Sequence, residues 1–307
     1  FFLHPHPAIR DAQESRGLGD VYKRQAQISD LMNRYGGGNK RLAIDTLSHT
    51  GCDALRARGL ELVEGEQITE TARAVKSDDE LKLMQVSMNV CQEGMRAMQV
   101  HLEPGMTENA LWSKLQETNI RLGGEWIETR LLSSGPRTNP WFRECSMRTI
   151  EKRDMNSFDT DLIGPYGYCS YLSRSWICGT TPTSEQKRLF EFAREQIEHN
   201  ISVLKPEKSF REISEQCWPI PEEFLSNRYS SLIHGVGLAD EYPNIKHWND
   251  FEQKGYDGII EPGMTLCVES FIGSEGGREG VKLEEQVLIT KTGVERMSDY
   301  PFELKII

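Results

Sequence analysis

The chain has 307 residues, of which 37% are hydrophobic and 27% are charged, and its formal net charge is −11. This composition is typical of a globular protein and argues against predominant disorder. The negative charge argues against a nucleic-acid partner, which needs a basic surface, and no apolar run approaches the roughly 18 residues that a membrane span requires. Seven cysteines without a Cys-x-x-Cys pair favour reduced thiols in a cytoplasmic protein.

The N-terminal residues differ in character from the rest of the chain. The chain starts at Phe1, and the segment from Arg10 to Gln25 resembles the translated sequencing adapter of a metagenomic gene fragment. We therefore expect residues 1–25 to be a non-native tail. Residues 26–75 are expected to be the remnant of an N-terminal domain, with a strand at 41–47 and a helix end, a glycine and a second strand across 54–66.

From residue 76 onward, the predicted elements form two similar rounds of two helices followed by hairpin strands. Four helix starts carry a side chain that can accept a backbone N–H of the first turn: Ser77, Thr107, Thr183 and Ser209. Six segments have the pattern of strands: 126–134, 156–163, 168–177, 230–237, 265–273 and 280–290. A long loop is expected between the fourth and the fifth. This order predicts an α+β fold with helices packed on one side of an antiparallel sheet.

Alternation along these strands brings acidic side chains to common faces. Because successive side chains point to opposite faces, Asp159 and Asp161 are expected to share one face of their strand. Glu269 and Glu284 are each expected to point away from the face that carries the apolar residues of their own strand. His234 adds an imidazole at a strand end. Taken singly, an acidic residue is usually solvated and such a histidine is usually a core residue. Together they indicate a metal site, because buried carboxylates are costly unless paired or metal-bound, and this donor set suits divalent ions and iron.

Six segments together resemble the creatinase/aminopeptidase P/methionine aminopeptidase superfamily: ARAVKSDDELKLM, SSGPRTNP, DTDLIGPYGYCSYLSRSW, IHGVGLADEYP, EPGMTLCVES and GVKLEEQVLIT. The resemblance implies the pita-bread fold, a curved antiparallel sheet covered by helices, over residues 76–307. It also implies that residues 26–75 are a truncated creatinase-type N-terminal domain and that the protein forms a homodimer.

The resemblance further implies five metal ligands, which fall on Asp161, Tyr171, His234, Glu269 and Glu284. Tyr171 stands where the superfamily carries an aspartate. A single base change in the codon, and thus a sequencing error, is one explanation. A genuine tyrosine would leave one weakly held ion, iron(III) held by a phenolate, or no metal, and Asp159 is the candidate to compensate. Iron is the expected ion, with zinc and manganese as alternatives.

Two further departures weaken a peptidase interpretation. Trp141 and Phe142 stand where the superfamily's peptidases carry a histidine, and Asp240 stands where they carry another. Those histidines hold the scissile peptide and its tetrahedral intermediate, so hydrolysis loses proton and oxyanion partners here. The variant pattern is similar to one branch of the superfamily, the dimethylsulfoniopropionate lyases of the DddP type. That resemblance implies Asp240 as the catalytic base, with Tyr229 as a second catalytic residue.

The implied substrate is a small zwitterion, a carboxylate that carries a sulfonium group on its β carbon. Aromatic faces suit a sulfonium, and Trp141 and Trp248 are the expected substrate-binding residues, whereas Phe142 and Tyr166 are expected to serve packing. A dry, apolar site is expected to raise the pKa of Asp240. Two alternatives remain: an Xaa-Pro dipeptidase or creatinase-like metallohydrolase, and a metal-free pseudoenzyme whose only direct support is Tyr171.

Overall fold

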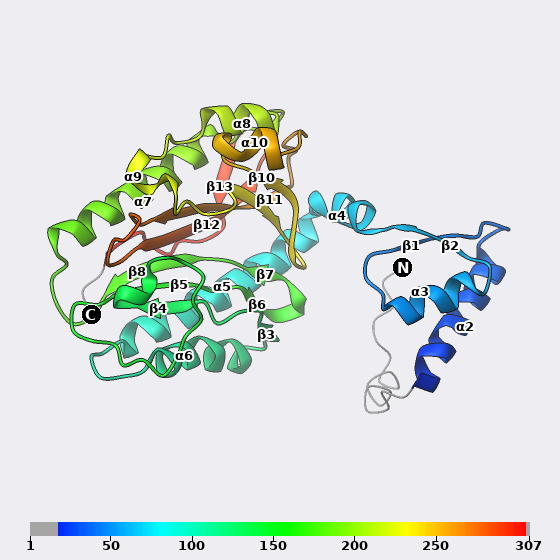
Figure 1. The fold of residues 1–307 in the computed structure, drawn as a ribbon, viewed down its shortest axis with the longest axis horizontal. Helices are drawn as coiled ribbons and strands as arrows, with labels where there is room; N and C mark the ends of the chain where they lie inside the picture. Colours follow the sequence, from blue (N-terminus) through cyan, green and yellow to red (C-terminus); the bar gives the residue numbers. More distant parts are fainter. Residues whose placement is uncertain (1–17, 305–307) are drawn as a thin grey trace. The chain divides into compact units, whose positions relative to one another are not determined.

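The computed structural model describes residues 18–304, and the chain divides into two compact units between Ala72 and Arg73. Of the expected tail, residues 1–17 lie outside the described residues, and residues 18–25 form the first part of helix α2 (Leu18–Tyr35). In the smaller unit, strands β1 (Arg41–Ile44) and β2 (Glu61–Glu64) pair in parallel on either side of α3 (His49–Arg56) (Figure 1). The strand, helix and strand predicted for this segment are therefore confirmed.

Helix α4 (Glu66–Ala74) contains the boundary between the units. The larger unit continues with α5 (Asp78–His101) and α6 (Glu108–Arg121). Further along lie α7 (Ser184–Val203), α8 (Phe210–Gln216), α9 (Glu222–Leu225) and α10 (Trp248–Lys254). All four predicted capping residues accept a backbone N–H at the start of their helix, as Ser77 does from Glu80 and Thr107 from Ala110. The capping patterns therefore located these helix starts correctly.

An antiparallel sheet runs through the larger unit in the order β10-β9-β11-β12-β8-β5-β4, with β13 beside β12. Its strands are β4 (Leu132–Ser134), β5 (Met155–Asp159), β8 (Ser173–Ile177), β9 (Ile233–Val236), β10 (Asp240–Ile245), β11 (Thr265–Ile272), β12 (Val281–Ile289) and β13 (Val294–Arg296). A smaller sheet contains β3 (Trp126–Ile127), β6 (Leu162–Ile163) and β7 (Cys169–Ser170). Short 3-10 turns follow at Gly135–Thr138 and Pro165–Gly167. The predicted α+β class is confirmed.

Three predicted strands are each broken in two, because one half joins the large sheet and the other half joins the small one. The break that affects the site falls after Asp159, where β5 ends. Asp161 has φ +36°, outside the extended region, and β6 begins at Leu162. The prediction that Asp159 and Asp161 share a strand face was therefore wrong, because the alternation rule holds only along continuous strand.

The predicted long loop before residue 265 was also wrong, since it contains β10 and α10. Strand β10 has no apolar alternation in its sequence and includes Pro243, which the strand pattern would exclude from a sheet interior. It lies at the end of the sheet order, and an edge strand tolerates a proline because one side of its backbone needs no partner.

Two apolar clusters hold the sheet between helices. Leu266, Val268 and Leu283, on β11 and β12, pack in one cluster with residues of α7, which runs along these strands in Figure 1. Phe158 and Trp176, on β5 and β8, belong to a second cluster with residues of α5 and α6. Complete burial of each such side chain contributes about 1.5–3 kcal/mol. The residues that alternate with Leu266, Val268 and Leu283 are left free to form a polar site.

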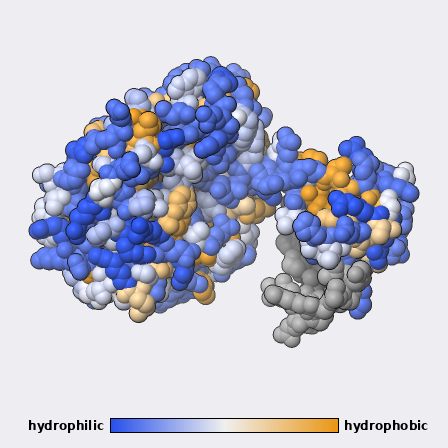
Figure 2. Space-filling model, in the orientation of Figure 1, coloured by the Kyte–Doolittle hydropathy of each residue, from blue (hydrophilic) through white to orange (hydrophobic). Residues whose placement is uncertain are grey.

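The face of the larger unit seen in Figure 2 is mainly hydrophilic, with apolar residues scattered over it. Exposed large apolar side chains include Val100, Met147 and Tyr166, which come from separate segments. Among the described residues, no helix combines the length and the apolar character that a membrane crossing would require.

Candidate active site

Eight of the ten predicted site residues line one cavity of about 260 Å³: Asp159, Asp161, Tyr171, Tyr229, His234, Asp240, Glu269 and Glu284. They come from the ends of β5 and β8, from the segment before β9, and from β9 to β12. The cavity wall also includes Glu128, Thr129 and Phe142. Residues that are up to 125 positions apart in the sequence, Asp159 and Glu284, are thus brought to one place.

The strand register brings possible metal-binding side chains into two cross-strand pairs. Cys267 on β11 lies opposite His234 on β9, and Glu269 on β11 lies opposite Glu284 on β12. Strand β10 can approach β9 closely because residue 235 is glycine: a Cβ there would collide with the backbone carbonyl of Tyr242. This approach brings Asp240, the first residue of β10, beside His234.

His234 is buried and has acidic partners at both ring nitrogens. Nε2 lies 3.0 Å from Glu269 Oε1 and 3.8 Å from Glu284 Oε1, and Nδ1 lies 2.9 Å from Asp240 Oδ1. Burial alone would lower the pKa of His234, but its hydrogen bonds to Asp240 and Glu269 raise that pKa well above its usual value. An imidazole oriented by a carboxylate at one nitrogen is the usual arrangement of a histidine that binds metal through the other.

Lys282 is a site residue that the sequence prediction missed. Its side chain is fully buried, and Nζ lies 2.6 Å from Glu269 Oε2, 3.0 Å from Asp159 Oδ2 and 3.7 Å from Glu284 Oε2. Nζ also donates to Ser173 Oγ at 2.8 Å. The signal was present in the sequence, because Lys282 and Glu284 are two residues apart on one strand and therefore share a face.

The buried acidic groups outnumber this one ammonium. Burial, with the charges of Asp159 and Glu269, raises the pKa of Glu284 well above its usual value, and burial beside Asp159 also raises that of Asp161. For Asp159, burial opposes ionisation, but the Lys282 ammonium and hydrogen bonds lower its pKa overall. Asp159 Oδ1 has no hydrogen-bond partner among the described residues. An added cation would satisfy this oxygen and favour ionised carboxylates, so the residues present fit a metal ion.

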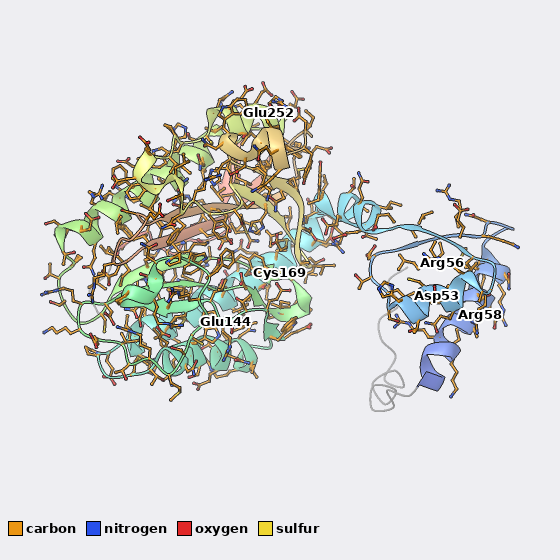
Figure 3. All side chains as sticks on the ribbon, in the orientation of Figure 1. Asp53, Arg56, Arg58, Glu144, Cys169 and Glu252 are labelled. Carbon is orange, nitrogen blue, oxygen red and sulfur yellow. The ribbon has the colours of Figure 1, made fainter. Side chains whose placement is uncertain are left out.

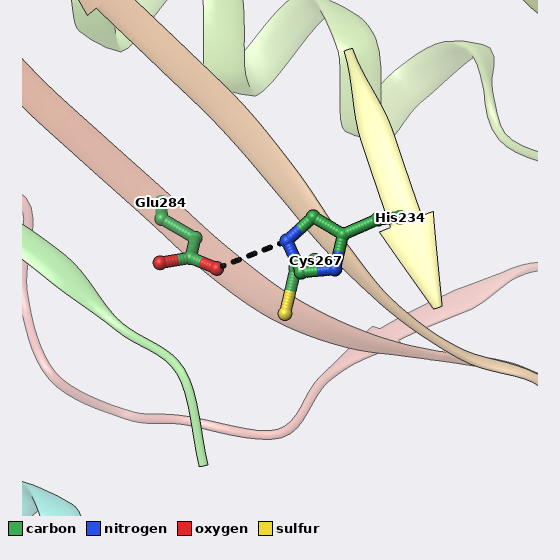
Figure 4. A group of neighbouring side chains, drawn as sticks. All are labelled: His234, Cys267 and Glu284. Carbon is green, nitrogen blue, oxygen red and sulfur yellow. Dashed lines mark ion pairs between the residues drawn. The ribbon is translucent and has the colours of Figure 1, made fainter. Parts of the chain in front are cut away.

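Two groups of donor atoms could hold such an ion. One is Asp159, Glu269 and Glu284, and the other is His234, Cys267 and Glu284, which Figure 4 shows on neighbouring strands. In each group the donor atoms lie within 4.8 Å of one another. Cys267 was not predicted as a site residue, although it lies two residues before Glu269. Asp161 belongs to neither group in the described part of the chain, and its carboxylate accepts a hydrogen bond from Thr129.

Tyr171 is buried, and its hydroxyl donates to Glu128 Oε2 at 2.8 Å. Its ring centroid is 6.2 Å from that of His234. Burial, then the neighbouring Cys169 of β7 (Figure 3), raises the pKa of the Tyr171 phenol above its usual range. The Tyr171 hydroxyl thus has Glu128 as its partner in this arrangement.

The aromatic residues that line the cavity differ from those that were expected to bind the substrate. Phe142 lines the cavity, and its ring stacks on Tyr229 with centroids 5.5 Å apart. Trp141 is buried in a cluster with Leu131 and Phe271, and Trp248 is 45% exposed on α10. Neither tryptophan is among the described residues that line the cavity. Phe142 was expected to serve packing. Trp141 and Phe142 are adjacent in the chain, and the sequence does not reveal which of the two side chains faces the cavity.

The environment of Asp240 also differs from the expectation. A dry, apolar surrounding was predicted, but the Asp240 side chain is 61% exposed at the cavity mouth and hydrogen-bonded to a buried imidazole. Its position at the junction of His234 and solvent remains compatible with proton transfer.

The chain is similar to known proteins in both sequence and fold. The model of metallopeptidase family M24 matches residues 82–291. The chain is 44% identical over 283 residues to the dimethylsulfoniopropionate lyase DddP of Roseovarius nubinhibens, covering 90% of this chain and 64% of that protein. It is 42% identical over 290 residues to the same lyase of Roseobacter denitrificans, covering 92% and 64%. The chain thus spans less than two thirds of the length of these relatives.

Among solved structures, an Xaa-Pro dipeptidase from Bacillus anthracis superimposes with a TM-score of 0.80 at 22% identity, covering 92% of this chain and 78% of that one. At this identity the likeness concerns the fold alone. It confirms the predicted pita-bread fold.

Proposed function

The chain belongs to metallopeptidase family M24, and on that premise we propose that it is a metal-dependent lyase that cleaves dimethylsulfoniopropionate into dimethyl sulfide and acrylate. The similarity to two dimethylsulfoniopropionate lyases at more than 40% identity carries the proposal. The substitutions at Trp141, Phe142 and Asp240, where the peptidases carry histidines, support a lyase over a dipeptidase.

The reaction is a β-elimination. A base removes a proton from the carbon next to the substrate carboxylate, the electron pair of that C–H bond forms the double bond of acrylate, and the C–S pair leaves with dimethyl sulfide. A bound ion would supply Lewis acidity, which favours loss of that proton. His234, Glu269 and Glu284, with Asp159 and Asp161 beside them, would hold the ion. Iron is the proposed ion, with zinc and manganese as alternatives.

Asp240 is proposed as the base. One of its oxygens contacts His234 Nδ1, and its exposure at the cavity leaves the other oxygen available to a substrate proton. Tyr229 is proposed as the second catalytic residue, and its stacked pair with Phe142 offers an aromatic wall. Aromatic faces attract a sulfonium without forming a covalent or ionic bond that would hinder departure of the neutral sulfide.

Three properties of the whole protein belong to the same proposal. The substrate is a small zwitterion, the protein forms a homodimer, and its location is cytoplasmic. Free thiols at all seven cysteines support a reducing compartment.

The test measures dimethyl sulfide and acrylate released from dimethylsulfoniopropionate by the full chain loaded with iron(II), zinc or manganese, beside hydrolysis of an Xaa-Pro dipeptide. We expect equal amounts of sulfide and acrylate and no dipeptide hydrolysis. Hydrolysis without sulfide release would instead support the dipeptidase alternative. Neither activity, in this chain and in Tyr171→Asp, would support the pseudoenzyme.

Asp240→Asn is the matched variant for the base. The amide oxygen can still accept a hydrogen bond from His234, so metal content should stay unchanged, whereas sulfide release should fall by about 100-fold or more, because general-base catalysis contributes about 10²–10⁴-fold. Full activity in Asp240→Asn would remove Asp240 from the role of base. A loss of bound metal would mean that Asp240 acts by orienting His234.

A further inference from the structure

Glu241 is a buried acid next to Asp240 on β10, and the proposed reaction does not use it. Because successive side chains of a strand point to opposite faces, Asp240 lines the cavity, whereas Glu241 is not among the described residues that do so. Glu241 accepts a 2.7 Å hydrogen bond from Lys76 Nζ and a 3.0 Å hydrogen bond from Arg73 Nε, one at each oxygen. Its side chain has no exposed surface, and that of Lys76 is 2% exposed. Two cations thus hold both oxygens of one buried carboxylate.

The two cations belong to a segment that is itself attached to the large sheet. Val75 forms an antiparallel bridge with Met264, directly before β11. The backbone N–H of Lys76 donates to the carbonyl of Gly263 at 2.9 Å. Because the segment is tied to the residues that lead into β11, it offers Glu241 a fixed support.

The start of β10 depends on such a support, because the sheet holds it weakly. Among the strands of the described residues, β10 pairs with β9 alone, at the end of the sheet order. Asp240 and Glu241 are in register with β9, and the register then shifts before Asn244. The Asp240 side chain is 61% exposed, so packing restrains it little. Segments with few buried contacts open locally more easily than the interior of a sheet.

Gly237, in the turn between β9 and β10, leaves room for the ion pair. A Cβ at this position would lie 2.4 Å from Glu241 Oε1 and 2.9 Å from Lys76 Cε. A larger residue would therefore displace the carboxylate or the ammonium. The turn that leads into β10 is thus shaped around the contact between Glu241 and Lys76.

We propose that Glu241 is a positioning residue that holds the Asp240 carboxylate beside His234 Nδ1. Lys76 and Arg73 fix Glu241, and Glu241 fixes the start of β10. Asp240 follows as its neighbour in the chain. The inference rests on the role of base proposed above for Asp240. A base must be held at the right distance from the substrate proton, and a misplacement of about 1 Å can lower a rate by about 100-fold.

The competing explanation is that the ion pair only stabilises the fold. Burial lowers the pKa of Lys76, although the charge of Glu241 acts to raise it. The attraction therefore does not recover the full cost of removing the ammonium from water. A buried ion pair of this kind contributes little net stability, whereas its directional contacts can fix a geometry. The balance favours a positional role.

The test compares Glu241→Gln in two backgrounds, the unmodified full chain and Asp240→Asn, both loaded with metal. Glutamine offers one acceptor oxygen, so its NH₂ group must face one of the two cations. In the unmodified background, we expect kcat for sulfide release to fall by about tenfold with KM unchanged. In Asp240→Asn we expect no further fall, because the carboxylate that Glu241 positions is already absent. An equal fall in both backgrounds, or full kcat in Glu241→Gln, would overturn the proposal.

Asp154→Asn is the matched control. Its carboxylate is also buried and lies 2.6 Å from Arg148 Nη1, but Asp154 is outside the described lining of the cavity. Asp154→Asn should lower stability and leave kcat unchanged. A fall in kcat as large as that of Glu241→Gln would mean that kcat follows general stability, which would contradict a positional role.

A measurement without substrate covers a chain that lacks lyase activity, and a milder variant covers the case in which Glu241→Gln does not fold. Arg73→Gln removes one of the two cations and keeps the contact between Lys76 and Glu241. Nuclear magnetic resonance of the chain with ¹⁵N-labelled histidine reports the hydrogen bond at His234 Nδ1. We expect that resonance to shift in Glu241→Gln and, less, in Arg73→Gln, but not in Asp154→Asn.

An unchanged His234 resonance in every folded variant would overturn this inference. No sulfide release from the unmodified chain, with the resonance shifted in the variants, would contradict only the proposed function.

Discussion

Glu284 and Glu285 are adjacent on β12, yet they meet opposite environments on the two faces of one sheet. Glu285 accepts a 2.8 Å hydrogen bond from Arg174 and another from Ser298, and both members of the Glu285–Arg174 ion pair are buried. Glu284 shares Lys282 with two other carboxylates. A buried acid with its own partner stabilises the fold, whereas a group of acids that exceeds its counter-charge indicates a ligand site.

The largest effect is expected on the paired face. Arg174→Met leaves Glu285 buried without a counter-ion and removes hydrogen bonds to the carbonyl groups of Ser173, Glu284 and Tyr300. The free energy of unfolding should fall by about 3–5 kcal/mol, measured by urea denaturation. Added metal should not change this loss. The double variant Arg174→Met/Glu285→Leu should recover part of it, and no recovery would mean that the carbonyl contacts dominate.

On the opposite face, Glu284→Gln should affect metal affinity rather than stability. Burial raises the pKa of Glu284, which reduces the cost of removing its charge in the metal-free protein, and glutamine has nearly the same shape. We expect little change in metal-free stability and about 100-fold weaker metal binding, equivalent to about 2.8 kcal/mol. Calorimetry with zinc measures the affinity. Glu285→Gln is the control, which should lower stability and leave zinc binding unchanged.

Tyr171→Asp should restore a carboxylate at the edge of the metal site. We expect about tenfold tighter zinc binding, or about 1.4 kcal/mol, because a carboxylate adds charge near the ion. Tyr171→Phe is the control, since it removes only the hydroxyl that bonds to Glu128. Equal affinities in all three proteins would show that position 171 does not contribute to the site.

The smallest effect is expected at a position that belongs to neither face. Ser77→Ala removes the capping box of α5, in which the Ser77 side chain accepts from the Glu80 backbone N–H. Stability should fall by about 1 kcal/mol, with metal affinity unchanged. Thermal denaturation with and without zinc measures both. A change in zinc affinity would mean that a general loss of stability also weakens metal binding. The effect of Ser77→Ala would then have to be subtracted from the effect measured for Glu284→Gln.

The sequence predicted the helix starts and most of the site because both depend on local patterns. Capping boxes act within four residues, and the superfamily motifs carry the ligand types with them. Lys282 and Cys267 were missed although they share strand faces with Glu284 and Glu269, because that spacing alone does not show that a lysine or a cysteine is buried beside the site. The break after Asp159, the edge strand β10 and the inward position of Phe142 instead of Trp141 depend on tertiary contacts, which strand patterns do not encode.

The most direct test of the proposed metal site is anomalous diffraction from crystals of the cobalt-loaded full chain. We predict a peak in the cavity, within bonding distance of His234 Nε2 and of carboxylate oxygens of Glu269 and Glu284. No peak in the cavity, or a peak away from these three residues, would contradict the proposed site.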